Sequence, residues 1–335
     1  YFAFDTFGEL RPFKQKFFET FGPARLPGEP LEDRHRALAF ALQNLTEEVI
    51  LHMVRHITRT SASRNLVVSG GVALNCVANA RILQYTDIER IWVPPNASDT
   101  GAPLGACLWH QYQTLGAKRA FELRRADYGL SYGEHDVERS LRAAGLAWER
   151  LDDATLFARL AHDIANGKVV GWFQGRFEMG PRALGQRSIV ADPRSAGMRD
   201  TLNAKIKKRE NFRPFAPAVL AERASDYFEI SQADPFMTLA PHVRLSRRAD
   251  IAAAVHVDGT ARIQTVEAAT QPRFHALISA FERLTGVPVL LNTSFNRKEP
   301  IVASPQDAVS CFTRTDMDVL VMGNHYAARA LTPAA

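Results

Sequence analysis

The groups best suited to binding a phosphate lie between residues 175 and 217, centred on the sequence GPRALGQRS. Glycines at 175, 180 and 185 allow the backbone to approach a ligand closely. Arg182 lies between Gly180 and Gly185 and directly follows Pro181, while Arg187 follows Gly185 and precedes the apolar run at 189–191. A guanidinium group is planar and presents paired donors that match phosphate oxygens. The segment therefore predicts a binding site for a phosphate-bearing substrate.

The second half of this segment, LNAKIKKRENFRPFAPAV, contributes further cations. A solvated face on an ordinary helix explains Lys205 and Lys208 equally well. It does not explain Arg213, which lies among prolines and phenylalanines, and the same holds for Arg182. We therefore count Lys207 and Arg213 with the candidate site.

The charge distribution narrows the class of ligand. The chain has a net charge of +5, and residues 176–213 alone hold ten basic and four acidic residues, an excess of six. A basic protein can bind nucleic acid or a small anion. A long nucleic-acid track would spread its charge, so the focused excess favours a compact polyanion such as ATP.

Two more candidates follow this segment. In LLNTSFN, a buried strand ends at Asn292 and Ser294, and ligands of α/β folds commonly bind at such strand ends. A simple capped turn is the alternative. Arg262 follows an Asp258–Gly259 pair that predicts a tight β-hairpin over residues 254–266, where it could equally be an exposed charge.

An earlier pair of motifs could contact a nucleotide. VVSGGVALN places Gly70 and Gly71 between a strand and a helix, a position that suits a phosphate or a ribose. In PPNASDTGAPLGA, Asp99 precedes a helix opened by glycines. Asp99 is a candidate metal ligand or a helix cap. A Gly-Gly turn alone is weak evidence, because such turns are common in α/β folds. The Asp-Thr-Gly loop about 28 residues later adds support to the prediction of a nucleotide site.

The elements around these motifs alternate between strands and helices, which indicates an α/β fold. Apolar residues at steps of three and four predict a helix over residues 33–58. The expected strands and helices are, in order, strand 65–71, helix 73–84, strand 88–95, a helix to about 113, strand 167–175, helix 197–208, helix 273–286, strand 287–295, a Ser-capped helix from 304 and a last strand at 318–323. A charged stretch at 118–127 predicts two domains, 1–117 and 130–335, joined by a linker at 118–129.

Several other classes of protein are disfavoured. The chain has neither a GxxxxGK[ST] loop nor a GxSxG motif. Its three cysteines have no zinc-ligand spacing, and His52 and His56 lie on a helix without an acidic partner motif. The N-terminus lacks a signal-peptide pattern, and no apolar run approaches the roughly 18 residues that span a membrane. We therefore expect a cytoplasmic protein.

Taken together, GPRALGQRS, IKKRENFRPFAP, DGTAR and LNTSFN resemble the carbamoyltransferase family, which includes nodulation-factor and antibiotic O-carbamoyltransferases. The resemblance covers nearly the whole chain. It implies a partial actin-like ATPase domain, similar to the tRNA threonylcarbamoyl-transfer protein, followed by an α+β domain of the YrdC/Sua5-like fold.

The resemblance also implies a reaction. Carbamoyl phosphate and ATP, with Mg²⁺, would give carbamoyl-adenylate in the C-terminal domain, and the carbamoyl group would pass to a hydroxyl of a sugar-containing or secondary-metabolite acceptor. The first domain would hold the transfer site, with iron as the implied metal. The implied residues are Arg182, Lys207, Arg262, Asn292 and Ser294 for catalysis, Gly70, Gly71, Asn75, Arg187 and Arg213 for the nucleotide, and Asp99 for the metal.

One departure limits this expectation. The family carries a further first-domain portion with a pair of histidine metal ligands, and nothing in this chain matches it. We therefore expect the C-terminal part of a longer enzyme, which keeps adenylate synthesis rather than complete transfer. The alternatives are a threonylcarbamoyl-type tRNA-modifying enzyme and a non-catalytic nucleotide-binding fragment. Neither nucleic acid nor membrane is favoured as a partner, and a homodimer is left open.

Overall fold

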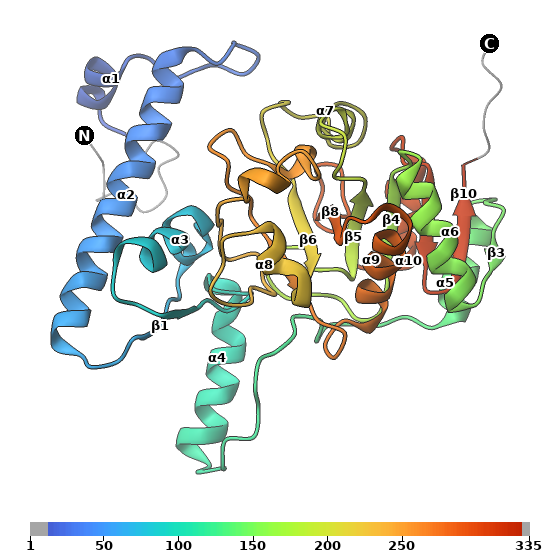
Figure 1. Ribbon diagram of the computed structural model, residues 1–335, viewed down its shortest axis with the longest axis horizontal. Coiled ribbons are helices and arrows are strands. Elements are labelled where there is room, and N and C mark those ends of the chain that lie inside the picture. Colours follow the sequence, from blue (N-terminus) through green and yellow to red (C-terminus); the bar gives the residue numbers. More distant parts are fainter. Residues whose placement is uncertain (1–12, 330–335) are drawn as a thin grey trace. The chain divides into compact units, whose positions relative to one another are not determined.

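The computed structural model describes residues 13–329 of the chain (Figure 1). These residues form two compact units: 13–62 with 85–87, and 63–84 with 88–329. The predicted linker at 118–129 lies inside the second unit, and residues 116–133 contain neither a helix nor a strand. The predicted division into domains at this linker stays a prediction.

The first unit is built on α2 (Asp33–Thr60), which confirms the predicted helix. Glu32 caps its first turn, where the Glu32 backbone N–H donates to the His35 ring at 3.0 Å. A short helix, α1 (Gln15–Phe21), precedes it. Val54 is the one buried residue of α2, and Leu42 and Leu45 are more than half exposed. The apolar spacing therefore predicts the helix correctly, while its apolar stripe faces outward among the described residues.

The second unit begins with the small elements that carry the Gly-Gly and Asp-Thr-Gly motifs. Two parallel strands, β1 (Asn65–Val67) and β2 (Arg90–Trp92), flank the helix α3 (Cys76–Tyr85). A 3-10 turn at Asp99–Gly101 then leads into α4 (Ala102–Trp109). The predicted order of strand, glycine turn, helix, strand, loop and helix is confirmed.

The rest of the second unit is a mixed sheet flanked by helices. Its strand order is β3-β10-β9-β4-β5-β8-β6-β7, with β4–β9 and β6–β7 parallel and the other pairs antiparallel. The strands are β3 (Glu149–Arg150), β4 (Val170–Phe173), β5 (Arg187–Ala191), β6 (Ala216–Leu220), β7 (Gln264–Val266), β8 (Val289–Ser294), β9 (Val319–Met322) and β10 (His325–Ala328). The fold class is therefore mixed α and β.

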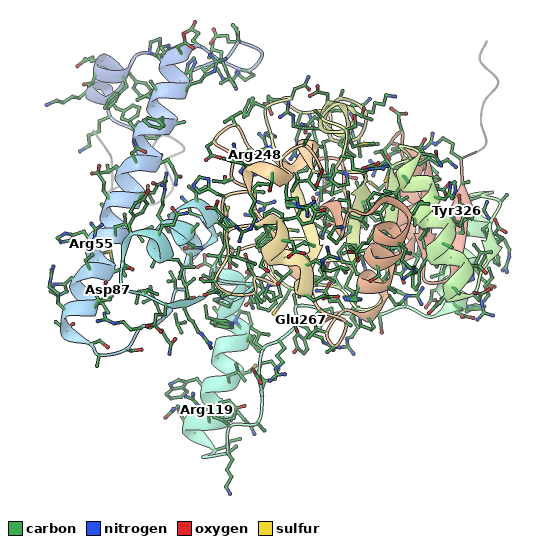
Figure 2. All side chains as sticks on the ribbon, viewed as in Figure 1. Arg55, Asp87, Arg119, Arg248, Glu267 and Tyr326 are labelled. Carbon is green, nitrogen blue, oxygen red and sulfur yellow. The ribbon has the colours of Figure 1, made fainter. Side chains whose placement is uncertain are left out.

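Helices pack on this sheet and close its core (Figure 1). The long ones are α5 (Glu134–Ala143), α6 (Asp153–Ala165), α9 (Pro272–Thr285) and α10 (Pro305–Thr313), and the short ones are α7 (Gly197–Thr201) and α8 (Ala224–Tyr227). The helix α9 packs on β6 and β8 and against α6, while α10 packs on β4 and β9. Polar contacts tie the layers together: the hydroxyl of Tyr326, labelled in Figure 2, donates to the carboxylate of Asp163 at 2.7 Å.

Local signals predict most of these elements correctly. Gly286 ends α9 with a φ of 75°, and the Ser304 hydroxyl caps α10 by accepting the Asp307 backbone N–H. The predicted basic helix at 197–208 is α7 followed by a π-helical turn, which ends at Lys208 with a φ of 46°. The strand at 319–322 is not the last one, because Gly323 and Asn324 turn the chain back into β10.

The predicted hairpin at residues 254–266 is wrong. The Asp258 carboxylate accepts the backbone N–H and the hydroxyl of Thr260 at 3.0 and 2.7 Å, which closes a tight local turn. The arm after this turn, β7, pairs in parallel with β6 instead of with the arm before it. The arm before it contains a 3-10 turn at Ala252–Ala254, whose apolar side chains are part of the core. The alternating pattern thus reflects burial, not mutual pairing.

Candidate functional site

The GPRALGQRS loop is held from inside by one buried carboxylate. Glu178 accepts the backbone N–H groups of Leu184, Gln186 and Arg187 at 2.7, 2.9 and 3.1 Å. Burial raises the pKa of Glu178 to about 7, against the effect of these three donors. The loop is thereby fixed as a rigid turn, with Arg182 at its outer end.

Gly180 shows why this loop needs glycine. Its φ is +91°, a conformation that other residues rarely adopt, and a Cβ at this position would overlap the carbonyl oxygen of Pro95. The loop therefore lies directly on the turn that follows β2. Residues about 85 positions apart in the sequence meet at this point.

Beside the loop is a cavity of about 490 Å³, which we call the arginine cavity. It is lined by four arginines from three chain segments, and among its described lining residues there is no carboxylate. Its wall consists of Cys76, Val77, Pro181, Arg182, Ala183, Arg209, Arg213, Pro214, Phe215, Ala216, Met237, His256, Arg262, Asn292, Thr293 and Ser294. A cavity of this size and charge fits a small anion.

Arg182 and Arg262 dominate the electrostatics of the arginine cavity. Neither guanidinium forms a hydrogen bond or an ion pair with any described residue, and Arg262 Nε is buried without a partner. Burial, together with the charge of Arg262, lowers the pKa of Arg182 to about 10. Two half-buried cations without a counter-ion are a costly arrangement in a folded protein. An anionic ligand would remove that cost.

Arg209 and Arg213 extend the positive wall. Arg209 donates to the side chain of Asn203 at 2.7 Å and lies over the Phe215 ring, with its Cζ atom 4.8 Å from the centroid. Arg213 is exposed and pairs with Glu210 at 3.0 Å. Arg209, Arg213 and Ser294 also line an adjoining cavity of about 410 Å³. The predicted Arg213 thus lies at the rim of both cavities.

Lys207 is buried and engaged with the end of β8. Its ammonium group contacts the Ser294 carbonyl and hydroxyl at 2.6 and 3.2 Å and the Asn296 carbonyl and side chain at 2.8 and 2.7 Å. Burial and the charge of Arg209 lower the pKa of Lys207 to about 7. It lines the adjoining cavity, not the arginine cavity. Lys207 therefore holds Ser294 in place at the boundary between the two.

Arg187 does not reach the arginine cavity. Its side chain is fully buried and donates to the backbone carbonyls of Gln174, Gln186 and Gly175. Its Cζ atom lies 3.6 Å from the centroid of the Phe173 ring. Burial lowers the pKa of Arg187 to about 10. This arginine braces the strand below the loop, so its predicted nucleotide contact has no geometric support.

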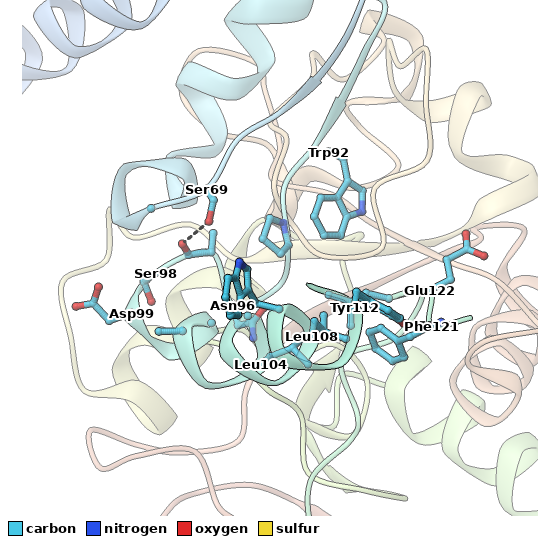
Figure 3. Close-up of a pocket in the computed structure, with 18 of the residues that line it drawn as sticks. Ser69, Trp92, Asn96, Ser98, Asp99, Leu104, Leu108, Tyr112, Phe121 and Glu122 are labelled. Atoms are coloured by element: carbon cyan, nitrogen blue, oxygen red, sulfur yellow. Dashed lines mark hydrogen bonds between the residues drawn. The ribbon is translucent and has the colours of Figure 1, made fainter. Parts of the chain in front are cut away.

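The motifs of residues 65–117 form a second hollow, the aromatic cleft, of about 880 Å³ (Figure 3). Apolar and aromatic side chains line it together with a few polar ones: Ser69, Gly70, Trp92, Pro94, Asn96, Ala97, Ser98, Asp99, Gly101, Ala102, Leu104, Gly105, Leu108, Trp109, Tyr112, Gln113, Arg119, Phe121, Glu122 and Leu123. Gly70 and Asp99 are therefore brought together on one surface. The predicted Gly71 and Asn75 are not part of it, and the Asn75 side chain accepts the Ala78 backbone N–H at 3.2 Å, inside the first turn of α3.

Asp99 is exposed and opens the 3-10 turn before α4. Within residues 13–329, no group of three His, Cys, Asp or Glu side chains is arranged to hold a metal ion. The described residues around Asp99 therefore do not by themselves fit iron or Mg²⁺, and its role as a ligand stays a prediction. Within the same range, no helix combines the length and apolar character of a membrane span.

The lining residues of the arginine cavity that were not predicted include Arg209, His256 and Cys76. In the sequence, nothing distinguishes Arg209 from the neighbouring cations Lys207 and Lys208. His256 lies before the Asp258 turn, and its ring contacts the Thr260 hydroxyl at 3.0 Å. Cys76 reaches the cavity because α3 is bonded to a distant loop: its carbonyl accepts the Ala240 N–H at 3.1 Å, and Asn79 donates to the Thr238 carbonyl at 2.9 Å. No local sequence signal predicts that contact.

Comparison with known proteins gives the family. The family model described as "Carbamoyltransferase C-terminus" matches residues 161–329, and that described as "Carbamoyltransferase N-terminus" matches residues 6–108. Nodulation protein NolNO of Sinorhizobium fredii is 44% identical over 90% of this chain and 45% of its own length. Nodulation protein NolO of Bradyrhizobium diazoefficiens is 41% identical over 89% of this chain and 56% of its own length. Nodulation protein U of the same species is 35% identical over 84% of this chain and 47% of its own length.

The chain thus spans about half the length of the curated relatives that it matches. The two family models fall on either side of residues 109–160, and the C-terminal one includes Arg182, Lys207, Arg262, Asn292 and Ser294. With more than half of its residues covered by that C-terminal model alone, the chain belongs to the carbamoyltransferase family.

Proposed function

We propose that this chain is the part of an ATP-dependent O-carbamoyltransferase that binds carbamoyl phosphate and ATP and forms carbamoyl-adenylate. The observation that carries the proposal is the pair Arg182 and Arg262, which face the arginine cavity without a counter-ion. Carbamoyl phosphate and ATP are both polyanions, and cations at the reacting phosphates are the main catalytic resource for such transfers.

The reaction balances as follows. Water releases phosphate from carbamoyl phosphate, a carbamate oxygen bonds to the α-phosphorus of ATP, and pyrophosphate leaves. Arg182 and Arg262 would bind the phosphate of carbamoyl phosphate, while Arg209, Arg213 and Lys207 lie toward the adjoining cavity, which has room for a polyphosphate. Uncharged groups at the end of β8, Asn292 and Ser294, suit the carbamoyl amide and oxygen.

We further propose the architecture implied by the family resemblance. Residues 130–335 would have a YrdC/Sua5-like fold, and the mixed sheet with the cavity at the end of β8 supports this proposal. Residues 1–117 would be part of an actin-like transfer domain. The acceptor would be a hydroxyl of a sugar-containing molecule, a proposal supported by the nodulation relatives. ATP and Mg²⁺ would be required, and iron at the transfer site would need ligands in addition to Asp99.

Pyrophosphate release tests the proposal directly. The chain is mixed with carbamoyl phosphate, ATP and Mg²⁺, and pyrophosphate is measured over time. We expect release, and a loss of about ten- to a hundredfold in Arg182→Ala, because a charge-assisted contact to a phosphate contributes about 1.5–3 kcal/mol. Lys207→Ala is expected to lower release as well, since it removes the group that holds Ser294.

Two results would contradict the proposal. Release that is unaffected in both variants would remove the arginine cavity from the reaction. Absence of release together with absence of ATP binding would favour a non-catalytic fragment, and strong, salt-sensitive binding of tRNA would favour the tRNA-modifying alternative.

A further inference from the structure

Asn292 carries an unused hydrogen-bond acceptor in the wall of the arginine cavity. Its side chain is 1% exposed, and its Oδ1 atom is buried without a partner among the described residues. Its Nδ2 atom, in contrast, donates to Gln264 Oε1 at 2.7 Å and to the Ala183 carbonyl at 3.2 Å. An unpaired buried acceptor destabilises a fold, because it has lost its hydrogen bond to water without gaining another. The arrangement therefore points to a donor that arrives with a ligand.

The orientation of the Asn292 amide is dictated by its neighbours. Gln264 lies on β7, across β6 from Asn292, and is fully buried. Its Nε2 atom donates to the Leu184 carbonyl at 2.7 Å. A backbone carbonyl only accepts, so the Gln264 amide must turn its nitrogen toward Leu184 and its oxygen toward Asn292.

The same argument then applies to Asn292. Two acceptors, Gln264 Oε1 and the Ala183 carbonyl, face one end of its amide, so that end must be the nitrogen. Flipping the amide would place oxygen against oxygen at both contacts. The oxygen is therefore the amide atom left without a protein partner among the described residues, on a residue that lines the cavity. The loop that carries Arg182 also fixes this choice through the carbonyls of Ala183 and Leu184.

We propose that Gln264 is a positioning residue that makes the arginine cavity selective for a phosphate ligand bearing an N–H donor. This inference rests on the proposed function, in which the ligand is carbamoyl phosphate. The arginines recognise the phosphate end, and Asn292 Oδ1 accepts from the amino group at the other end. A site with a buried acceptor rejects an analogue that lacks the donor, because the acceptor is then left unpaired. Acetyl phosphate is such an analogue, with a methyl group in place of the amino group.

The test compares the two ligands by isothermal titration of the chain. We expect carbamoyl phosphate to bind at least about tenfold more tightly than acetyl phosphate, which corresponds to about 1.4 kcal/mol. In Gln264→Leu, the Asn292 amide is released and the preference should fall to about twofold or less, with inorganic phosphate still bound. Gln271→Ala is the matched control, because the Gln271 side chain accepts from Gln264 Nε2 at 3.4 Å, whereas Asn292 donates to the other end of the Gln264 amide, Oε1. It should keep the preference.

The outcomes separate this inference from the proposed function. Equal affinity for both ligands in the wild type overturns the inference and leaves the proposed function standing. Absence of binding of either ligand and of inorganic phosphate overturns both. If Gln264→Leu fails to fold, Gln264→Met provides the same test, because it removes the amide oxygen while keeping the length of the side chain. Asn292→Leu tests the acceptor itself, because it removes Oδ1 while keeping the volume. A preference that survives in Gln264→Leu but is lost in Asn292→Leu would assign the selectivity to Asn292 alone and overturn the role of Gln264.

Discussion

The two hollows of the second unit differ in how their charges are compensated. The arginine cavity gathers four arginines with no carboxylate among its described lining residues. The aromatic cleft is larger, about 880 Å³ against 490 Å³, and its wall combines Trp92, Trp109, Tyr112 and Phe121 with Asp99, Glu122 and Arg119. In the arginine cavity, Arg182 and Arg262 have no counter-ion among the described residues, whereas the wall of the aromatic cleft holds two carboxylates beside Arg119. Anion binding should therefore be a property of that cavity and not of the cleft.

The largest expected effect concerns the point where the two regions meet. The turn at Pro94–Asn96 contributes to the aromatic cleft, and the Pro95 carbonyl is the group on which Gly180 packs. We expect Gly180→Ala to lower the free energy of unfolding by roughly 2–3 kcal/mol, because both its φ and the contact are unfavourable for a Cβ. Urea denaturation measures this change.

Gly133→Ala is the control for that variant. Gly133 has a φ of −82°, and a Cβ there would meet nothing within 4 Å. Because Gly133 is the N-cap of α5, where Gly is preferred to Ala, its substitution should lower stability by about 1 kcal/mol or less. If both variants were equally stable, the turn after β2 would not brace the loop of the arginine cavity. The stability of that loop would then not depend on the residues of the aromatic cleft.

The contrast between Arg182 and Arg187 shows how far sequence reasoning reaches. Both lie in one nine-residue motif, five positions apart, yet Arg182 faces the cavity and Arg187 is buried against backbone carbonyls. Local signals predicted helix α2, strand β8 and the Ser304 cap, because each depends on neighbours in the chain. Which arginine faces a ligand depends on the tertiary positions of Glu178, Gln174 and Phe173, which spacing does not encode.

The failed hairpin and the missed Cys76 have related causes. The Asp258–Gly259 pair does make a tight turn, but the segments on its two sides pack elsewhere in the core. The strand that β7 pairs with is therefore set by the tertiary fold and not by the turn. Cys76 is 106 residues from Arg182 in the sequence and joins it on the cavity wall through contacts between α3 and residues 238–240. A contact between residues so far apart in the chain produces no local spacing pattern, so a single sequence does not predict it.

A smaller effect tests whether the buried lysine belongs with the uncompensated cations. The pKa of Lys207 is lowered from 10.5 to about 7, so between these pH values the unfolded chain binds more protons than the folded one. The free energy of unfolding should then rise with pH, by about 1–2 kcal/mol between pH 7 and pH 9. Lys207→Met should remove this rise.

The measurement is a series of urea denaturations across that pH range. Lys205→Met serves as the control, because Lys205 is an exposed lysine on the same helical segment and its loss should leave the wild-type slope. An unchanged slope in Lys207→Met would mean that the four oxygen contacts at the end of β8 fully compensate its charge. Lys207 would then be a structural group, unlike Arg182.

The smallest effect compares one arginine from each hollow. Arg213 lies at the rim of the arginine cavity, where it is exposed and forms an ion pair with Glu210. We therefore expect Arg213→Ala to weaken carbamoyl phosphate binding by only about threefold. Arg119, labelled in Figure 2, lines the aromatic cleft. Arg119→Ala changes the net charge equally and should alter the affinity by less than that, since salt screens charges beyond about 10 Å. Titration calorimetry at 0.1 M salt distinguishes the two, and an equal loss in both variants would show that total charge, and not the compensation within each hollow, governs anion binding.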